Sequence, residues 1–221
     1  MHSPRAIVFD LDGTLIDSSR DIAAAVNHAL ERAGLPLLTL ERVKSFVGDG
    51  ARPLVARAGA LDLDDPRVET LLATFLDYYT AHPATFSRPM PKAVETLVEL
   101  GERYPLALAT NKPRRTTDAA LAALELTRHF RVVVAGGDPP RPKPSGEALT
   151  FIAERLGVAA GELVMVGDGP QDVLAGRAAG ARTVGVLGGM ASDERLLAVE
   201  PDAVLATLEE LSALLEVWAG S

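Results

Sequence analysis

The chain has 221 residues, 48% of them hydrophobic, which is enough for a continuous core in one large domain or two smaller ones. Its 22 basic and 30 acidic residues give a net charge of -8, and an acidic protein repels the phosphate backbone, so we expect no nucleic-acid partner. Cysteine is absent and the four histidines are scattered singly, which argues against disulfides and structural zinc.

The sequence carries no signal for export or membrane insertion. Only four consecutive apolar residues precede Asp10, far fewer than the core of a signal peptide needs. No uninterrupted apolar run approaches the length that spans a bilayer. We therefore expect a cytoplasmic protein with no membrane partner, present as a monomer or a homodimer.

Five short apolar runs stand out along the chain, each too short to be a helix. Four of them are followed by stretches in which apolar residues recur at helical spacing. This alternation predicts an α/β fold, with a doubly wound, Rossmann-like parallel sheet joined by crossover helices. The predicted strands are, in chain order, 6–9 (AIVF), 106–109 (LALA), 132–135 (VVVA), 163–166 (LVMV) and 183–187 (TVGVL).

One segment, residues 18–89, breaks this rhythm. It contains several helix-like stretches and no convincing strand. Because it directly follows the first predicted strand, we expect an inserted α-helical cap domain over the carboxyl edge of that strand. Residues 1–17 and 90–221 would then form the α/β core, and the stretch SRPMPK at 87–92 is the best hinge candidate.

Polar side chains follow three of the predicted strands. Asp10 and Asp12 follow the first strand, Thr110 and Asn111 follow the second, and Asp168 comes just after the fourth. Ligands of open α/β sheets gather beyond the carboxyl ends of the strands, where the loops share one crevice. We therefore expect these five residues to meet in one site.

The two carboxylates of the first loop point to a cation. Asp10 and Asp12 would repel each other unless a cation or a catalytic task compensates. Asp168 would add a third carboxylate, and Mg²⁺ prefers oxygen ligands of this kind. Gly13 and Thr14 fit a turn whose backbone N–H groups hold an anion. The alternative is that Asp10 and Asp12 only cap a turn.

The remaining polar candidates each have a chemical and a structural interpretation. Thr110 and Asn111 either hold phosphoryl oxygens or form a turn. Lys143 lies between two prolines before a predicted helix, and is either a site cation or an exposed lysine. Asp172, four residues after Asp168, either joins the site or favours a helix N-terminus electrostatically.

Four motifs in chain order, DLDGT (10–14), ATN (109–111), PKP (142–144) and GDGPQD (167–172), resemble the signature of the haloacid dehalogenase-like superfamily of phosphohydrolases. The first motif is highly specific and the second is weak, and together they cover essentially the whole chain. The helical insertion after the first motif is similar to the helical cap class of that superfamily. The chain departs from the pattern at Gly169, where many members place a serine or threonine.

The resemblance implies roles for the three aspartates. Asp10 would attack phosphorus to form an aspartyl phosphate, while Asp12 would act as general acid and then as general base. Mg²⁺ would lie between the Asp10 carboxylate, the Asp12 backbone carbonyl and Asp168. The acid at position 12 also argues for phosphate esters, because a departing halide needs no proton.

The resemblance also implies how the phosphoryl group is held. Thr110, Asn111 and Lys143 would bind the phosphoryl oxygens, with Lys143 as the positive charge. Asp172 would orient Lys143 or the metal ligands. The occupant of position 171, glutamine, is not the commonest one.

Substrate choice is expected to depend on the predicted cap. The stretch FVGDGARPLVARA at 46–58 resembles the glycine-containing cap loop of phosphoglycolate phosphatases. Gly48 and Gly50 permit close approach of the backbone to a ligand, the following helix offers N–H groups to a carboxylate, and Arg52 adds a charged contact. The alternative is a helix-to-helix turn with an exposed arginine. We hypothesise a small carboxylated phosphate ester such as 2-phosphoglycolate.

Other functions remain open on the same residues. The scaffold suits a sugar-phosphate or nucleotide phosphatase, a pyrophosphatase or a phosphosugar mutase. A different class is a non-enzymatic regulator that binds phosphorylated metabolites, or a receiver-like switch phosphorylated on Asp10. Asp12 disfavours this class, because a pure binder has no use for a general acid.

Overall fold

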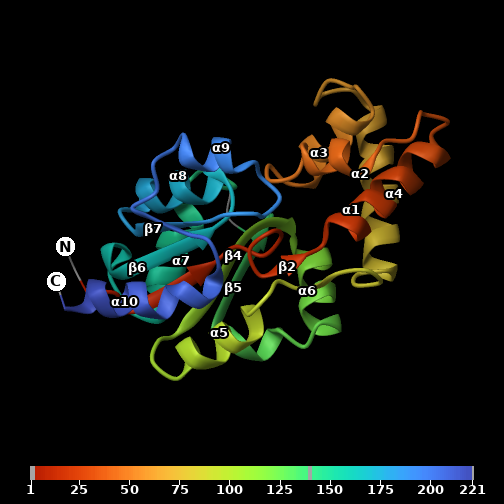
Figure 1. Ribbon diagram of the computed structural model, residues 1–221. Helices are drawn as coiled ribbons and strands as arrows, with labels where there is room; N and C mark the ends of the chain where they lie inside the picture. Colours follow the sequence, from red (N-terminus) through yellow and green to blue (C-terminus); the bar gives the residue numbers. More distant parts are fainter. Residues whose placement is uncertain (1–2, 139–140, 221) are drawn as a thin grey trace.

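The structure, a computed structural model, describes residues 3–138 and 141–220. Its centre is a parallel six-stranded sheet in the order β5-β4-β1-β6-β7-β8 (Figure 1). The strands are β1 (Ala6–Phe9), β4 (Leu106–Pro113), β5 (Val132–Gly136), β6 (Leu163–Gly167), β7 (Arg182–Val186) and β8 (Ala203–Leu205). The five predicted strands and the α/β Rossmann-like class are confirmed.

β1 lies at the point in the sheet where the order of successive strands reverses. From β1 the chain moves to β4 and then to β5 on one side, and β6, β7 and β8 lie on the other side. Open parallel sheets place their ligand crevice at such a reversal. The loops after β1, β4 and β6 therefore share one edge of the sheet.

Helices cover both faces of the sheet, because successive side chains of a strand point to opposite faces. Ile7 and Phe9 of β1 belong to the core formed with α5, α6 and α10, whereas Ala6 and Val8 belong to the core formed with α7 and α8. These helices are α5 (Ala93–Gly101), α6 (Arg114–Ala123), α7 (Glu147–Leu156), α8 (Pro170–Ala179) and α10 (Leu211–Ala219), and the short α9 (Asp193–Leu197) follows β7.

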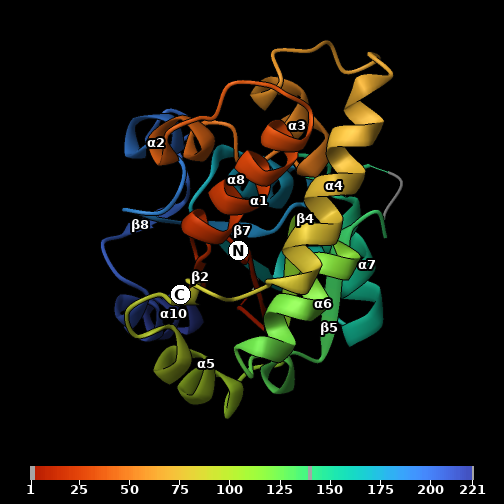
Figure 2. The same cartoon turned by 90° about the vertical axis from the view of Figure 1, so that its right-hand side faces the viewer.

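Four helices between β1 and α5 form a helical insertion, drawn in orange to yellow at the upper right of Figure 1. Its helices share a hydrophobic cluster of their own, which includes Ile22, Leu54 and Phe75. Figure 2 shows α1 and α4 packed side by side. The helices are α1 (Ser19–Arg32), α2 (Leu40–Lys44), α3 (Ala51–Ala58) and α4 (Arg67–Ala81).

A two-stranded antiparallel ribbon links the insertion to the sheet. Its strands are β2 (Ile16–Asp17), where the chain leaves the sheet, and β3 (Arg88–Pro89), where the chain returns. The predicted hinge stretch, 87–92, contains β3. Short 3-10 helices cover Thr127–His129, Ala160–Glu162 and Leu208–Glu210. None of the helices in the described part of the chain has the length and apolar character that crossing a membrane requires.

Candidate active site

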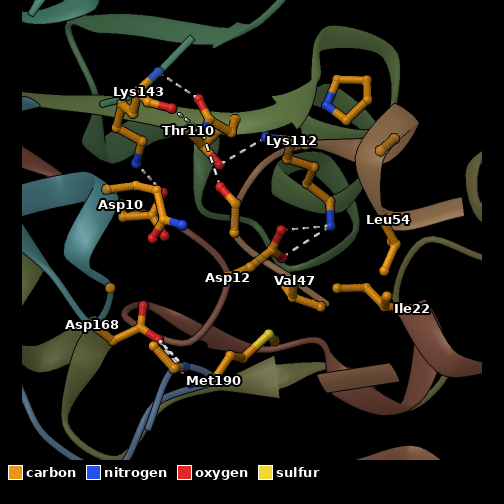
Figure 3. Close-up of a pocket in the computed structure, with 18 of the residues that line it drawn as sticks. Asp10, Asp12, Ile22, Val47, Leu54, Thr110, Lys112, Lys143, Asp168 and Met190 are labelled. Carbon is orange, nitrogen blue, oxygen red and sulfur yellow. Dashed lines mark hydrogen bonds and ion pairs between the residues drawn. The ribbon is translucent and has the colours of Figure 1, made fainter. Parts of the chain in front are cut away.

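A pocket lies at the carboxyl edge of the sheet, between the sheet and the helical insertion (Figure 3). The sheet side supplies the ends of β1, β4 and β6, and the insertion supplies α1, α3, α4 and the loop before α3. Two sequence-predicted site residues, Gly13 and Arg52, do not line the pocket. The predicted residues that do line it are Asp10, Asp12, Gly48, Gly50, Thr110, Asn111, Lys143, Asp168 and Asp172.

Lys143 is buried at the floor of this pocket and binds three oxygens. Its Nζ lies 2.6 Å from Oδ1 of Asp10, 2.5 Å from Oδ1 of Asp172 and 2.7 Å from the carbonyl oxygen of Ala109. Burial alone would lower the pKa of the Lys143 ammonium, but the charges of Asp10 and Asp172 raise it above its usual value. Lys143 is therefore a site cation in this structure and not an exposed lysine.

Burial has the largest effect on the pKa of the Asp10 carboxyl. Desolvation raises the pKa of its carboxyl from 3.8 to about 7, against the opposing charge of Lys143, and the nearby Asp172 and Asp12 push in the same direction as burial. The carboxyl of Asp10 thus lies in a place that holds more negative charge than one ammonium neutralises.

Asp168 is held rigidly by the loops around it. Its Oδ1 accepts a hydrogen bond of 2.9 Å from the Thr14 hydroxyl, and its Oδ2 accepts the backbone N–H groups of Met190 at 2.7 Å and Ala191 at 3.2 Å. Burial, followed by the charge of Asp10, raises the pKa of Asp168 to about 6 in spite of these three donors.

Three buried carboxylates form a cluster that could hold a divalent metal ion. Ligand oxygens of Asp10, Asp168 and Asp172 all lie within 4.8 Å of one another. Burial raises the pKa of Asp172 as well, so the charged form of all three carboxyls is disfavoured unless a cation compensates it, as a hard divalent ion would. The donor set fits such an ion. Asp172 joins the predicted Asp10 and Asp168 in this group of side-chain ligands, and the backbone carbonyl of Asp12 stays a predicted ligand.

Asp12 lies beside this cluster with its carboxylate turned to other partners. Its Oδ1 accepts a hydrogen bond of 2.5 Å from the Ser18 hydroxyl at the start of the insertion. The Nζ of Lys112 lies 2.9 Å from Oδ1 and 3.1 Å from Oδ2 of Asp12. Asp10 and Asp12 thus face two different lysines, an arrangement that simple turn capping does not need.

Lys112 is a pocket residue that sequence reasoning missed. Its side chain is only 5% exposed, and besides Asp12 it donates to the hydroxyl of Tyr79 on α4 at 2.8 Å. Burial alone would lower its pKa, but the charge of Asp12, followed by Tyr79, raises it above its usual value. One signal was available, because the chain has only four lysines and this one directly follows Thr110 and Asn111.

Asn111 uses its amide on the protein backbone. Its Nδ2 donates to the carbonyl oxygens of Gly48 and Lys143, both at 2.9 Å, and its Oδ1 accepts the N–H of Lys143 at 2.9 Å. Asn111 therefore positions Lys143 and ties the insertion loop to the sheet. Thr110 lines the pocket, and its Oγ1 accepts the N–H of Lys112 at 3.2 Å.

The insertion loop reaches the pocket with its backbone. Gly48 and Gly50 line the pocket with positive φ angles of 123° and 95°, as predicted for glycines that bring backbone close to a ligand. Asp49 between them accepts a hydrogen bond of 2.7 Å from the side chain of Gln171 at the start of α8. The glutamine thus adds a second contact between loop and sheet.

Arg52 points away from the pocket, contrary to the expected charged contact. Its guanidinium pairs with Glu69 and donates to the carbonyl oxygen of Leu63 at 2.9 Å. The reason is helical geometry: Arg52 is the second residue of α3, and the face of that helix turned to the pocket carries Ala51 and Leu54.

Gly13 lies outside the pocket and packs closely against Asp168. Its N–H donates to the carbonyl oxygen of Ile16 at 2.8 Å, so it is not the predicted anion donor. Its φ is 94°, and a Cβ at this position would collide with the carboxylate of Asp168. The predicted need for glycine is thus met by close packing against Asp168.

Comparison with known proteins identifies the family. The model of the haloacid dehalogenase-like hydrolases matches residues 7–186, most of the chain. The chain belongs to this family. The phosphoglycolate phosphatase of Pseudomonas putida is 39% identical over 219 residues, covering 96% of this chain and 79% of that protein. The phosphoglycolate phosphatase of Neisseria meningitidis serogroup A is 38% identical over 218 residues, covering 94% and 92%.

A solved structure agrees with this relationship over the whole length. The crystal structure of a predicted phosphoglycolate phosphatase from Haemophilus somnus superposes with a TM-score of 0.88 at 27% identity, covering 97% of this chain and 99% of that one. The chain is therefore an enzyme of the phosphatase class, similar to phosphoglycolate phosphatases.

Proposed function

We propose that this enzyme is a Mg²⁺-dependent hydrolase of small phosphomonoesters, with 2-phosphoglycolate as its substrate, and that Asp10 is its nucleophile. The observation that carries the proposal is the buried group of Asp10, Lys143, Asp168 and Asp172 at the end of β1, with Asp12 next to it. A carboxylate nucleophile, a separate acid and a fixed cation are what the transfer of a phosphoryl group to a side chain requires.

In the first half of the reaction, an oxygen of Asp10 attacks phosphorus and the bond from phosphorus to the ester oxygen breaks. The phosphoryl group becomes attached to Asp10 as an acyl phosphate, and the leaving alkoxide takes its proton from Asp12. Lys143, within 2.6 Å of Asp10, stabilises the negative charge of the phosphoryl oxygens.

In the second half, water attacks the phosphorus of the acyl phosphate and loses a proton to Asp12. Inorganic phosphate departs, Asp10 returns to its carboxylate form, and Asp12 is protonated for the next cycle. Mg²⁺, held by Asp10 and Asp168, would reduce the repulsion between the nucleophile and the anionic substrate. Asp172 keeps Lys143 in place through its 2.5 Å contact.

We assign the helical insertion, residues 18–89, the role of a cap that excludes water during both halves. Its loop at 46–50 is tied to the sheet by Asn111 and Gln171, and its helices supply the apolar wall of the pocket. The names of the relatives support 2-phosphoglycolate as the substrate.

The proposal is tested by phosphate release from a panel of phosphorylated metabolites with and without Mg²⁺. We expect 2-phosphoglycolate to have a kcat/KM about a hundredfold above those of sugar phosphates, nucleotides and pyrophosphate, with no turnover in a chelator. A best substrate without a carboxylate would remove the substrate assignment. Transfer of phosphate to a sugar without release would indicate a mutase instead.

A further inference from the structure

The pocket contains a buried cation that the proposed phosphoryl chemistry does not use. Lys143 already makes three contacts of 2.7 Å or less beside the nucleophile. Lys112 stands at the other aspartate, Asp12, on the side of the pocket that faces the insertion (Figure 3). Burying an ammonium this deeply costs free energy unless the ammonium has a defined partner, so the position of Lys112 needs a structural or functional reason.

We propose that Lys112 is the specificity-determining residue that binds the carboxylate of the substrate, exchanging its ion pair with Asp12 for one with the incoming carboxylate. This inference rests on the proposed function and gives it the cation that Arg52 does not supply.

The position of Lys112 follows from the position of the leaving group. The ester oxygen must come within hydrogen-bond distance of Asp12 to receive a proton. The Nζ of Lys112 lies 2.9 Å and 3.1 Å from the two oxygens of that same carboxylate. In 2-phosphoglycolate a single methylene separates the ester oxygen from the carboxylate, so a substrate whose ester oxygen reaches Asp12 brings its carboxylate to Lys112.

The exchange leaves no buried charge without a partner, because Asp12 must be in its neutral acid form to protonate the leaving group and then no longer needs a cation. Lys112 gives up one carboxylate and gains another, so its ammonium stays paired throughout. Asp12 keeps its hydrogen bond with the Ser18 hydroxyl and becomes available to the ester oxygen. A substrate without a carboxylate offers no such exchange, and this difference favours the carboxylated substrate.

Tyr79 fixes Lys112 from the insertion side. Its hydroxyl accepts a hydrogen bond of 2.8 Å from Nζ, and Nζ lies 4.1 Å from the centre of its ring. Tyr79 is fully buried on α4, so its hydroxyl holds the Nζ of Lys112 in a fixed position in the pocket. Apolar residues such as Leu54 and Phe75 surround this part of the pocket, which strengthens a charged contact by excluding water.

The test compares two substrates of equal length, 2-phosphoglycolate and 2-hydroxyethyl phosphate, which differ in the carboxylate alone. In Lys112→Met we expect the ratio of their kcat/KM values to fall by about tenfold to a hundredfold, mainly through a higher KM for 2-phosphoglycolate. Lys112→Arg should restore part of the ratio, because it retains the charge. Arg52→Met, which removes a cation of the insertion that points away from the pocket, is the matched control and should retain the full ratio.

The outcomes separate this inference from the proposed function. A wild-type enzyme with no preference for 2-phosphoglycolate would overturn both. A wild-type preference that survives in Lys112→Met would overturn this inference alone, as would an equal loss of kcat on both substrates, since that loss would mean that Lys112 acts only through Asp12. Loss of the ratio in Arg195→Met, another cation that lines the pocket, with the ratio intact in Lys112→Met, would reassign the carboxylate contact.

Discussion

The ammonium of Lys143 connects Asp10, the proposed nucleophile, to the rest of the site. This ammonium binds Asp10 and Asp172, and the side chain of Asn111 forms hydrogen bonds with both the backbone N–H and the carbonyl oxygen of Lys143. Two buried carboxylates share this one cation, so its removal would leave both without compensation.

Replacing Lys143 with methionine should therefore impair both activity and stability. We expect kcat to fall by about a hundredfold to a thousandfold, because the fixed positive charge at the phosphoryl group is lost. We expect the free energy of unfolding to fall by about 3–5 kcal/mol, as is typical when one partner of a buried ion pair is removed. Steady-state kinetics and urea unfolding measure the two effects. A methionine variant with wild-type kcat would show that this ammonium has no part in the chemistry.

Asp168 gives the metal-free protein a pH dependence whose sign can be worked out. Burial raises the pKa of the Asp168 carboxyl from the ordinary 3.8 to about 6, so the folded state holds the proton more tightly than the unfolded chain between these pH values. The stability contributed by this group is fully present below about pH 4 and is lost as the pH rises through about 6.

The matching experiment uses Asp168→Asn, which keeps the shape and removes the titration. In the presence of a chelator, the wild type should lose on the order of 1–3 kcal/mol of unfolding free energy relative to this variant between pH 4 and pH 7. Saturating Mg²⁺ should restore the wild type and leave the variant unchanged, because the ion compensates the buried charge of Asp168. Parallel pH profiles for the two proteins in chelator would contradict the burial of Asp168 as an uncompensated acid.

At the scale of elements, the two connections of the insertion are joined by one buried aspartate. Asp21, near the start of α1, accepts the N–H groups of Phe86 and Ser87 at 3.0 Å and 2.7 Å, and the Ser87 hydroxyl at 2.6 Å. Phe86 and Ser87 directly precede β3, so the outgoing and returning chain meet at a single carboxylate.

Asp21→Ala should loosen this junction without touching the pocket. We expect a loss of about 1–3 kcal/mol of unfolding free energy, because the N–H and the hydroxyl of the buried Ser87 are left without an acceptor. Asp64→Ala, an exposed aspartate of the same insertion, is the control and should change stability by less than about 0.5 kcal/mol. Chemical denaturation measures both. Equal midpoints for the two variants would mean that Asp21 does not hold the connections together.

The elements that the sequence predicted are those with a strong local pattern. The runs at 6–9 and 163–166 are buried on both faces, so an unbroken apolar stretch identifies them as central strands. β8 has only three residues at the edge of the sheet, with Val204 exposed, and β2 and β3 have two residues each. Such strands depend on the partner they pair with, which no local pattern reveals.

The site was predictable where it depends on strand ends and not where it depends on helix rotation. Asp10 and Asp168 had to meet, because parallel neighbouring strands end at the same edge. Arg52 could not be placed, since one residue of helix turns a side chain from the pocket to the surface. Lys112 was overlooked because its partners, Asp12 and Tyr79, are 100 and 33 residues away in the chain.

At the scale of the whole molecule, the site exists only where the sheet and the insertion meet. The sheet supplies nearly all of the charge at the pocket floor, and the insertion supplies the apolar wall and the glycine loop. Contacts from Asn111 to Gly48 and from Gln171 to Asp49 hold the two parts together at the pocket. The fold therefore brings a charged centre on the sheet together with an apolar cover from the insertion.

The central claim is that phosphorus becomes covalently bound to Asp10 during each turnover. The most direct measurement is a rapid acid quench of enzyme mixed with 2-phosphoglycolate labelled on its phosphoryl group, followed by peptide mapping. We predict acid-stable label on the peptide that contains Asp10, a higher level of label in Asp12→Ala, where breakdown is slowed, and none in Asp10→Asn. A wild-type enzyme that turns over rapidly but carries no label at any quench time, in Asp12→Ala as well, would contradict the account.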